Sequence, residues 1–496
     1  MFFNYQCAQN YTFFYLNTYL VMVLKFNLIC TSNNTKNLKT SLFNTFPFSP
    51  TDDQQSALHL LTSFLESKSH LQVFILRGYA GTGKTTILAH LAKTLNKDKK
   101  IVLLAPTGRA ARVLSSYCGL PAFTIHKKIY RMADGDAGEM NFVLQKNNFT
   151  DTLFIIDEAS MIASGYNGER DVLEDLMRFV YRGKGCKLIF SGDTAQLPPV
   201  EMSYSPALDK EFMMDRFHIP VTEFELNQVV RQAQESGVLY NATKLRKALQ
   251  LKSQEVKFDV SFDDFKSING LELQDYLEES IHEFGADEVL IVTRSNKRAN
   301  QFNAEIRNRL LYREDEIEAG DILMGVKNNY HWLSKEENKD DFIANGESLE
   351  VLKVLSRQTM YGFEFADLNI RFIDDRIPDV DLKIWLDCLT TEGSAMPHSD
   401  VSSLYYSIME DYVSQGESKN AKQLTLGDPF YNALQCKFSY AVTCHKAQGG
   451  QWAAVFIDHG YLTDEMVDEN LLRWFYTAVT RSHKKVYLVN FNEMFL

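Results

Sequence analysis

This chain of 496 residues lacks several sequence features that mark metal-binding, redox or membrane proteins. Its seven cysteines form no CxxC pair, which argues against a zinc ribbon or a thioredoxin-type redox site. A sparse and odd set of cysteines in a large chain is typical of a reducing compartment, so we expect a cytoplasmic protein. Long apolar runs without charge do not recur, which excludes a polytopic membrane protein.

The chain also lacks an excess of positive charge. It has 52 basic and 64 acidic residues and a net charge of −12, so bulk charge indicates neither a nucleic-acid nor a membrane partner. Any surface that binds anions must therefore be local. One such region runs from Arg77 to Arg131, where eleven basic residues are opposed by one acidic residue, Asp98. Such a patch would bind a nucleic-acid backbone in a salt-dependent way, although a charged helix surface accounts for part of it.

Acidic residues are absent from the first 51 positions. The stretch Tyr11–Cys30 is apolar, but Lys25 and two asparagines interrupt it and no basic residue precedes it. A secretory signal normally begins with positive charge, and a transit peptide is normally rich in arginine. We therefore interpret residues 1–46 as an extension without a chemical role. A disordered tail, a gene start placed too early and a targeting segment are the alternatives.

What the chain does contain is an alternation of compact apolar runs and amphipathic helical stretches. Runs that are apolar throughout suit parallel strands buried on both faces. The pattern predicts two α/β domains, with a segment of different character at about 320–430 inserted into the second. The apolar runs are Val73–Leu76, Ile101–Ala105, Leu153–Ile156, Lys187–Ser191, Val289–Thr293, Ala454–Asp458 and Val486–Asn490.

A glycine-rich loop follows the first of these runs. The residues from Gly78 to Thr85 match the phosphate-loop pattern G-x-x-x-x-G-K-[ST], between a strand and a helix that begins near Ile87. Glycines allow backbone N–H groups to surround phosphate oxygens, and the helix N-terminus favours negative charge. Lys84 would reach the β- and γ-phosphates of ATP, and the Thr85 hydroxyl would bind Mg²⁺. The predicted nucleotide-binding residues of this loop are Gly78, Ala80, Gly81, Thr82, Gly83, Lys84, Thr85 and Thr86.

Two carboxylates end the third run, at Asp157 and Glu158. The carboxyl ends of parallel strands meet at one edge of a sheet, so both side chains are expected beside the phosphate loop. Asp157 is predicted to hold Mg²⁺, and Glu158 to orient and deprotonate the attacking water.

The ordered set of motifs resembles that of the superfamily-one helicases, and most closely the RecD/Dda group, which translocates 5′ to 3′ on single-stranded DNA. The resemblance extends from residue 51 to the end of the chain. The matching segments are Thr51–Ala57, Ala105–Ala111 (motif Ia), Thr124–His126, Asp157–Ser160 (motif II), Gly192–Val200 (motif III), Val230–Gln232 (motif IV), Thr443–Gly449 (motif V) and Tyr476–Arg481 (motif VI). After motif V the sequence departs from the pattern, because Gly450-Gln451-Trp452 stands where an acidic residue is common.

The resemblance assigns roles that spacing alone does not. It implies that Gln54 reads adenine and that Gln196 senses the γ-phosphate. It implies that Arg231 and Arg481 act as arginine fingers, which stabilise charge on the transferred phosphoryl group. By the same resemblance, the residues that contact DNA are Pro106, Thr107, His126, Thr443 and His445. The turn Thr293–Asn296 with Asn300 and Asn303 either contacts phosphates or caps backbone groups.

The expected fold class is α/β, with two RecA-like phosphate-loop domains. A short hairpin in the first domain would be the separation pin of this group, or an ordinary surface hairpin. A β insertion in the second would be SH3-like. The predicted ranges are 1–46 for the extension, 47–115 and 151–215 for the first domain, 116–150 for the hairpin, 216–319 and 431–496 for the second domain and 320–430 for the insertion.

The sequence therefore predicts an ATP-dependent DNA helicase that uses ATP and Mg²⁺. Its expected partners are single-stranded and forked DNA, with replication or repair proteins as candidates and no membrane. We expect a monomer. An RNA helicase and a nucleic-acid-stimulated ATPase switch that does not unwind are the alternatives, because no residue identifies a 2′-hydroxyl sensor. The pathway, whether repair, replication or recombination, is not indicated.

Overall fold

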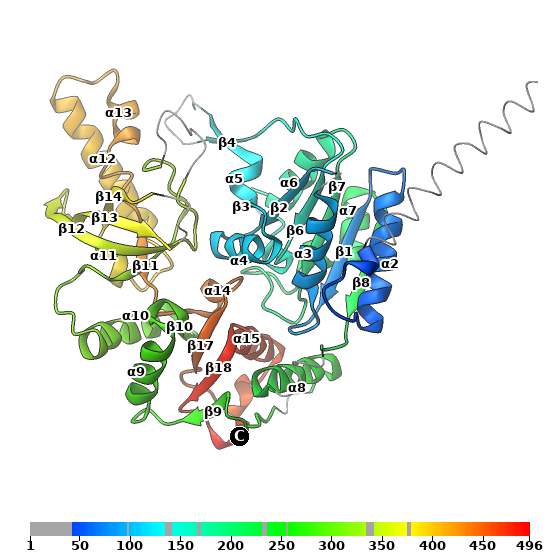
Figure 1. The fold of residues 1–496 in the computed structure, drawn as a ribbon. Helices are drawn as coiled ribbons and strands as arrows, with labels where there is room; N and C mark the ends of the chain where they lie inside the picture. The colour runs from blue at the N-terminus through cyan, green and yellow to red at the C-terminus, as the bar shows by residue number, and fades with distance from the viewer. Residues whose placement is uncertain are drawn as a thin grey trace, which may run out of the picture.

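The computed structural model describes residues 42–496, apart from 97–98, 134–140, 166–169, 231–235, 254–255, 334–341 and 374–377. Most of the N-terminal extension and one predicted arginine finger, Arg231, therefore lie outside the described residues. The described residues form three large β-sheets and one two-stranded hairpin, and Figure 1 shows the three large sheets as separate parts around the central helix α14 (Cys444–Ala447). Within the described ranges, no helix is both long enough and apolar enough to span a bilayer.

The first sheet is parallel, with six strands in the order β3-β2-β6-β7-β1-β8. Both faces are covered by apolar clusters, as continuous apolar strands require. Its strands are β1 (Val73–Gly78), β2 (Ile101–Ala105), β3 (Ala122–Thr124), β6 (Leu153–Ile156), β7 (Lys187–Gly192) and β8 (Val221–Leu226). Its helices are α2 (Asp52–Glu66), α3 (Lys84–Leu95), α4 (Gly108–Cys118), α5 (Ile125–Ile129), α6 (Val172–Arg182) and α7 (Lys210–Phe217).

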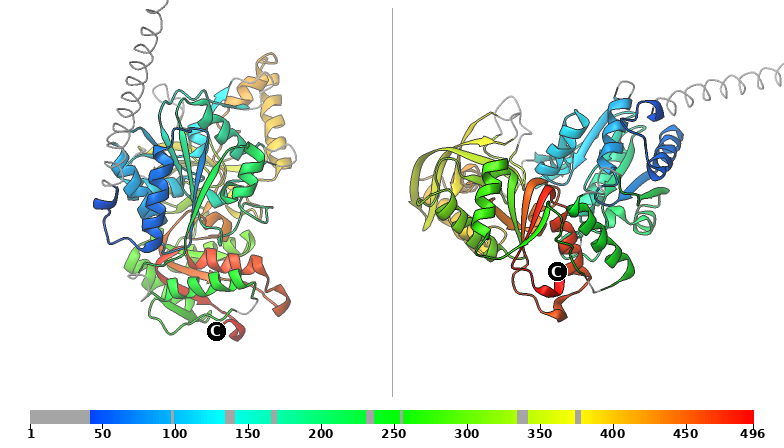
Figure 2. Two further views of the ribbon diagram at one scale, coloured as in Figure 1. Left: turned by 90° about the vertical axis from the view of Figure 1, so that its right-hand side faces the viewer. Right: turned by 60° about the horizontal axis from the view of Figure 1, so that its bottom comes forward.

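The second sheet is also parallel, with five strands in the order β16-β10-β17-β18-β9. Helices α8 and α15 pack side by side against it (Figure 2). Its strands are β9 (Phe265–Ile268), β10 (Val289–Thr293), β16 (Ala441–Thr443), β17 (Trp452–Asp458) and β18 (Ser482–Val489). Besides α14, its helices are α8 (Gly237–Leu251), α9 (Leu273–Phe284), α10 (Asn296–Glu305) and α15 (Glu469–Val479). The predicted pair of α/β domains is thereby confirmed.

The insertion is an antiparallel sheet in the order β14-β13-β12-β11-β15, which carries helices between β14 and β15. Its strands are β11 (Ile322–Gly325), β12 (Ser348–Met360), β13 (Phe363–Phe372), β14 (Val380–Trp385) and β15 (Cys436–Phe438). Its helices are α11 (Asp387–Thr390), α12 (His398–Ser414) and α13 (Ala421–Gly427), and the last two project at the upper left of Figure 1.

A two-stranded hairpin, β4 (Tyr130–Ala133) and β5 (Asn141–Leu144), leaves the first domain after α5. The tip of this hairpin falls outside the described residues, and its use as a separation pin stays a prediction.

Three strands lie across the boundaries that we predicted. β8 pairs with β1, so the first sheet continues past residue 215, and β3 belongs to the same sheet although it falls within 116–150. β15 follows residue 431 but pairs with β11 of the insertion. Short strands take their sheet from their pairing partners, and local sequence does not show those partners.

Candidate nucleotide and DNA site

The phosphate loop joins β1 to α3, and its glycines adopt conformations that other residues rarely reach. Gly81 and Gly83 have φ angles of +75° and +86°. A Cβ on Gly83 would also overlap Nε2 of Gln54. The Lys84 ammonium lies against the loop and donates to the carbonyl of Gly78 at 2.6 Å and to that of Tyr79 at 3.2 Å. The predicted loop residues are therefore brought together in one turn.

Gln54 approaches this turn from α2. Its Nε2 donates to the carbonyl of Thr82 at 3.0 Å, and its Oε1 accepts from the backbone N–H of Thr51 at 3.1 Å. Thr51 in turn caps α2, so the entry motif forms a capping box. The structure thus places Gln54, which is 4% exposed, on the phosphate loop. Its reading of adenine stays a prediction.

Asp157 and Glu158 follow β6 at the edge of the sheet where the phosphate loop lies. Asp157 Oδ1 accepts from the Ser191 hydroxyl at 2.9 Å, and its Oδ2 lies 3.5 Å from the Thr85 hydroxyl oxygen. One carboxylate and one hydroxyl beside a phosphate loop suit Mg²⁺, which keeps several waters and binds substrate phosphates. Thr85 and Asp157 therefore fit the predicted metal site.

Glu158 has a strained backbone and a perturbed side chain. Its φ of +52° is left-handed, which is costly for a residue with a Cβ and recurs at functional sites. Burial raises the pKa of Glu158, and the positive charge of Arg481 opposes that rise. Burial also raises the pKa of Asp157, against the charge of Lys84. The two acids thus lie among cations from both α/β domains.

Motif III lies between these acids and the second domain. Asp193 Oδ2 is 4.0 Å from Lys84 Nζ, and its Oδ1 accepts from the N–H of Ala195 at 2.9 Å. Gln196 is 5% exposed, and its Oε1 is buried without a hydrogen-bond partner among the described residues. Buried polar atoms of this kind are rare and require an explanation. The sensing of the γ-phosphate by Gln196 stays a prediction, because the unpaired atom is the amide oxygen, which accepts hydrogen bonds and does not donate them.

Motifs V and VI hold motif III from the second domain. The Thr477 hydroxyl accepts from the N–H of Leu197 at 2.8 Å, and Gln448 Nε2 donates to the Leu197 carbonyl at 2.7 Å. The Tyr476 hydroxyl donates to Asp193 Oδ2 at 2.6 Å, and Arg473 donates to the carbonyl of Thr194. Sequence reasoning assigned roles to Thr443, His445 and Arg481 of these motifs but none to Gln448, Tyr476 or Thr477. The sequence did not show that these residues lie next to motif III, because they are far from it along the chain.

Arg481 is 3% exposed and is fixed within its own domain. Its Nε donates to the Thr477 carbonyl at 2.9 Å, and Nη1 donates to the Gly450 carbonyl at 3.2 Å. The structure does not describe Arg231. Its neighbour Val230 does reach the phosphate loop, with its N–H donating to the Gly81 carbonyl at 3.0 Å.

The candidate DNA contacts of motif Ia lie where the two domains meet. Thr107 caps α4 by accepting from the N–H of Ala110 at 3.2 Å, and Pro106 precedes it with partial exposure. Motif V approaches closely, since a Cβ on Gly449 would lie 3.2 Å from Thr107 Oγ1 and 2.8 Å from the Cβ of Ala110. The structure therefore brings motifs Ia and V together.

The remaining DNA candidates lie on two short helices. Thr443 precedes α14 and is partly exposed, and His445 is exposed on that helix. His126 lies on α5, where its ring contacts that of Tyr130 with centroids 5.4 Å apart. Burial, together with the charge of Arg170, lowers the pKa of His126. None of these side chains has a contact that assigns it to DNA.

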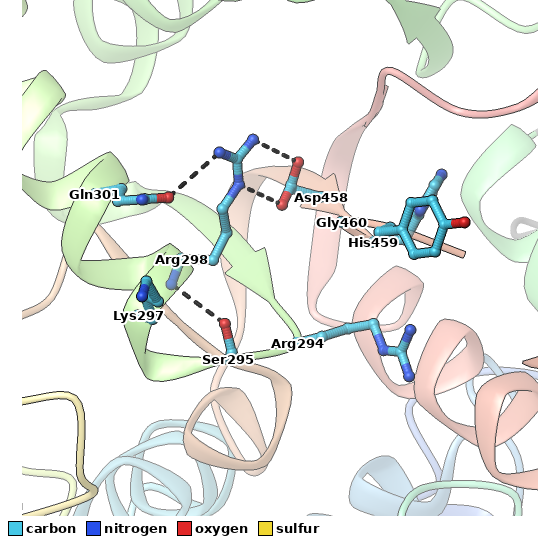
Figure 3. Close-up of a pocket in the computed structure, with 9 residues that line it drawn as sticks. Arg294, Ser295, Lys297, Arg298, Gln301, Asp458, His459 and Gly460 are labelled. Atoms are coloured by element: carbon cyan, nitrogen blue, oxygen red, sulfur yellow. Dashed lines mark hydrogen bonds and ion pairs between the residues drawn. The ribbon is translucent and has the colours of Figure 1, made fainter. Parts of the chain in front are cut away.

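The turn after β10 lines a pocket with the end of β17 (Figure 3). Ser295 caps α10 by accepting from the N–H of Arg298 at 3.2 Å, and Arg298 binds Asp458 with distances of 3.0 and 3.2 Å. Asn300 donates to the carbonyl of Thr390, and Asn303 to that of Ala441. For Ser295 and both asparagines, the contacts favour the capping interpretation over phosphate binding.

Comparison with known proteins matches residues 51–257 to the family described as AAA domain and residues 438–489 to the UvrD-like helicase C-terminal domain. The chain is 24% identical over 290 residues to the ATP-dependent DNA helicase dda of Enterobacteria phage T4, covering 55% of this chain and 60% of that protein. It is 32% identical over 142 residues to the ATP-dependent RecD2 DNA helicase of Deinococcus radiodurans, covering 28% of this chain and 18% of the relative. The chain is thus similar to the superfamily-one helicases related to RecD and Dda.

Among solved structures, the chain is similar to a Pif1 helicase from Bacteroides in complex with ADP-AlF3 and single-stranded DNA. The TM-score is 0.45 at 16% identity, covering 90% of this chain and 94% of the other.

Proposed function

We propose that the protein is an ATP-dependent DNA helicase that moves along single-stranded DNA and unwinds duplex, with an expected 5′-to-3′ polarity. The observation that carries this proposal is the contact of motifs V and VI with motif III. Gln448, Thr477 and Tyr476 of the second domain bind motif III of the first, beside Lys84. A nucleotide pocket built across two domains couples phosphate chemistry to their relative position.

The residues around the pocket divide the chemistry among them. Lys84 would neutralise the β- and γ-phosphates of ATP, and Thr85 and Asp157 would hold Mg²⁺, which would offset the phosphate charge. Glu158 would take the proton of the attacking water. Arg481 would stabilise the charge that develops on the γ-phosphoryl group. In family members with an arginine finger, this contribution is on the order of 10³ or more in rate.

DNA is proposed to bind where α4 meets α14. Pro106 and Thr107 lie at the N-terminus of α4, which favours anions. Thr443 and His445 lie at the start of α14 in the second domain, and Gly449, which follows that helix, lies close to Thr107. ATP hydrolysis would then change the distance between the two domains, each of which contacts the same DNA strand. Repeated cycles would move the protein along that strand. The relatives named as DNA helicases and the motif order support DNA over RNA.

The experiment that tests the proposal is steady-state ATP hydrolysis with single-stranded DNA, with single-stranded RNA of the same length and with neither. We expect DNA to stimulate hydrolysis, and Lys84→Ala to lower the stimulated rate by about 100-fold or more, as for loss of one transition-state donor. Equal stimulation by RNA would contradict the DNA assignment. Hydrolysis that persists in Lys84→Ala would contradict the phosphate loop as the site.

A further inference from the structure

The phenol of Tyr476 joins the two α/β domains at the phosphate loop. Tyr476 lies on α15 of the second domain and is 1% exposed. Its hydroxyl donates to Asp193 Oδ2 at 2.6 Å and accepts from the backbone N–H of Ala80 at 2.9 Å. One hydroxyl group therefore contacts both motif III and the loop that is proposed to bind ATP.

Asp193 connects this hydroxyl to the lysine of the phosphate loop. The carboxylate is 1% exposed, and the oxygen that accepts from Tyr476 is the one that lies 4.0 Å from Lys84 Nζ. Burial, followed by the charge of Asp193, raises the pKa of Tyr476 well above its ordinary value, so the phenol stays protonated and remains a donor. The hydroxyl and the ammonium thus lie at the same buried oxygen, the hydroxyl at the shorter distance.

We propose that Tyr476 is a positioning residue that releases Lys84 from Asp193 when the second domain closes on the phosphate loop. The inference rests on the proposed function, because it requires that the two domains change their approach during ATP hydrolysis. With the second domain withdrawn, Asp193 loses its neutral donor, and Lys84 is the cation that already lies 4.0 Å from the same carboxylate oxygen. Lys84 would then be drawn away from the phosphates. Closure returns the hydroxyl to Asp193 and frees the ammonium.

The test compares full-length Tyr476→Phe with the unaltered protein. The phenylalanine keeps the packed ring and removes one hydrogen bond to a charged group. Such a bond corresponds to about a tenfold effect or more. We expect the DNA-stimulated kcat to fall by about tenfold or more, with the Kd for single-stranded DNA unchanged within about twofold. Tyr487→Phe is the matched control, because Tyr487 is 4% exposed in the same domain but packs on the opposite face of the sheet. It should behave like the unaltered protein.

A second variant separates positioning from a loss of packing. Asp193→Asn removes the charge that holds Lys84, so adding it to Tyr476→Phe should restore part of the stimulated kcat. If the hydroxyl served only packing, the double variant would be slower than Tyr476→Phe, and the inference would be overturned. A Tyr476→Phe protein with an unaltered stimulated kcat would also overturn it. Absence of DNA stimulation in the unaltered protein would instead refute the proposed function, and the Lys84→Ala comparison detects that case separately.

Discussion

The guanidinium of Arg109 lies 3.7 Å from the centre of the Trp452 ring, which joins α4 of the first domain to β17 of the second. Arg109 Nη2 also donates to the Gln451 carbonyl at 3.2 Å. Burial, and then the charge of Arg112, lowers the pKa of Arg109 to about 10, so it remains a cation at neutral pH. This pair fixes the helix that carries motif Ia against the segment that follows motif V.

Replacing Arg109 with lysine should weaken the coupling between DNA and ATP. Lysine keeps the charge but cannot stack a plane on the indole, and a desolvated cation–π contact contributes about 2 kcal/mol. We expect the DNA concentration that gives half-maximal ATP hydrolysis to rise severalfold. Arg178→Lys is the control, since Arg178 pairs with Glu174 on an exposed helix face. Identical DNA titrations of Arg109→Lys and the unaltered protein would contradict the role of the pair.

Gly449→Ala should separate motif V from motif Ia. The φ of Gly449 is +73°, and the added Cβ would lie 2.8 Å from the Cβ of Ala110. Gly362→Ala provides the comparison, because its φ is +80° but a Cβ there meets nothing within 4 Å. Both variants carry backbone strain of about 1–2 kcal/mol. We expect a loss of DNA-stimulated hydrolysis in Gly449→Ala alone. Equal losses would show that strain, rather than the contact, is responsible.

The pH profile of hydrolysis should reflect the buried acids. A general base works in its deprotonated form, and burial raises the pKa of Glu158 above that of an exposed glutamate, about 4.3. The rate should therefore begin to fall at a higher pH than an exposed carboxylate would cause. Glu158→Gln should remove this decline together with most of the rate. A constant rate from about pH 8 down to about pH 5 would contradict Glu158 as the base.

The insertion is attached to α4 by an ion pair between Arg112 and Glu347, with Nη2 and Oε1 2.8 Å apart. Glu347 also fills the space where a side chain on Gly108 would stand. A double-mutant cycle with Arg112→Ala and Glu347→Ala should give a coupling energy of about 1–3 kcal/mol in thermal or denaturant unfolding. Additive effects would show that the pair does not bind the insertion to the first domain.

Seven of the strands in the parallel sheets could be predicted because burial on both faces leaves an uninterrupted apolar signal, as in Leu153–Ile156. The short or partly polar strands β3, β8, β9 and β16 lack that signal and were not predicted. The phosphate loop could be predicted because its glycines, lysine and threonine are local in sequence. β15 could not be assigned, because its three residues join a sheet whose other strands lie before residue 386.

In the candidate site, the charged residues could be predicted from the sequence, whereas the residues that position them could not. Lys84, Asp157 and Glu158 follow from local motifs, and the structure brings them together. The contact of Tyr476 with Asp193 joins residues 283 positions apart, and no local pattern indicates it. The role of Arg231 stays a prediction that the described residues do not address.

Unwinding of a forked duplex with either a 5′ or a 3′ single-stranded tail tests the central claim most directly. With ATP and Mg²⁺, we predict strand separation from the 5′-tailed fork only, and none with Lys84→Ala. Unwinding from the 3′ tail would preserve the helicase but contradict the expected polarity. DNA-stimulated hydrolysis without strand separation from either fork would contradict the helicase proposal and identify the protein as a switch driven by ATP.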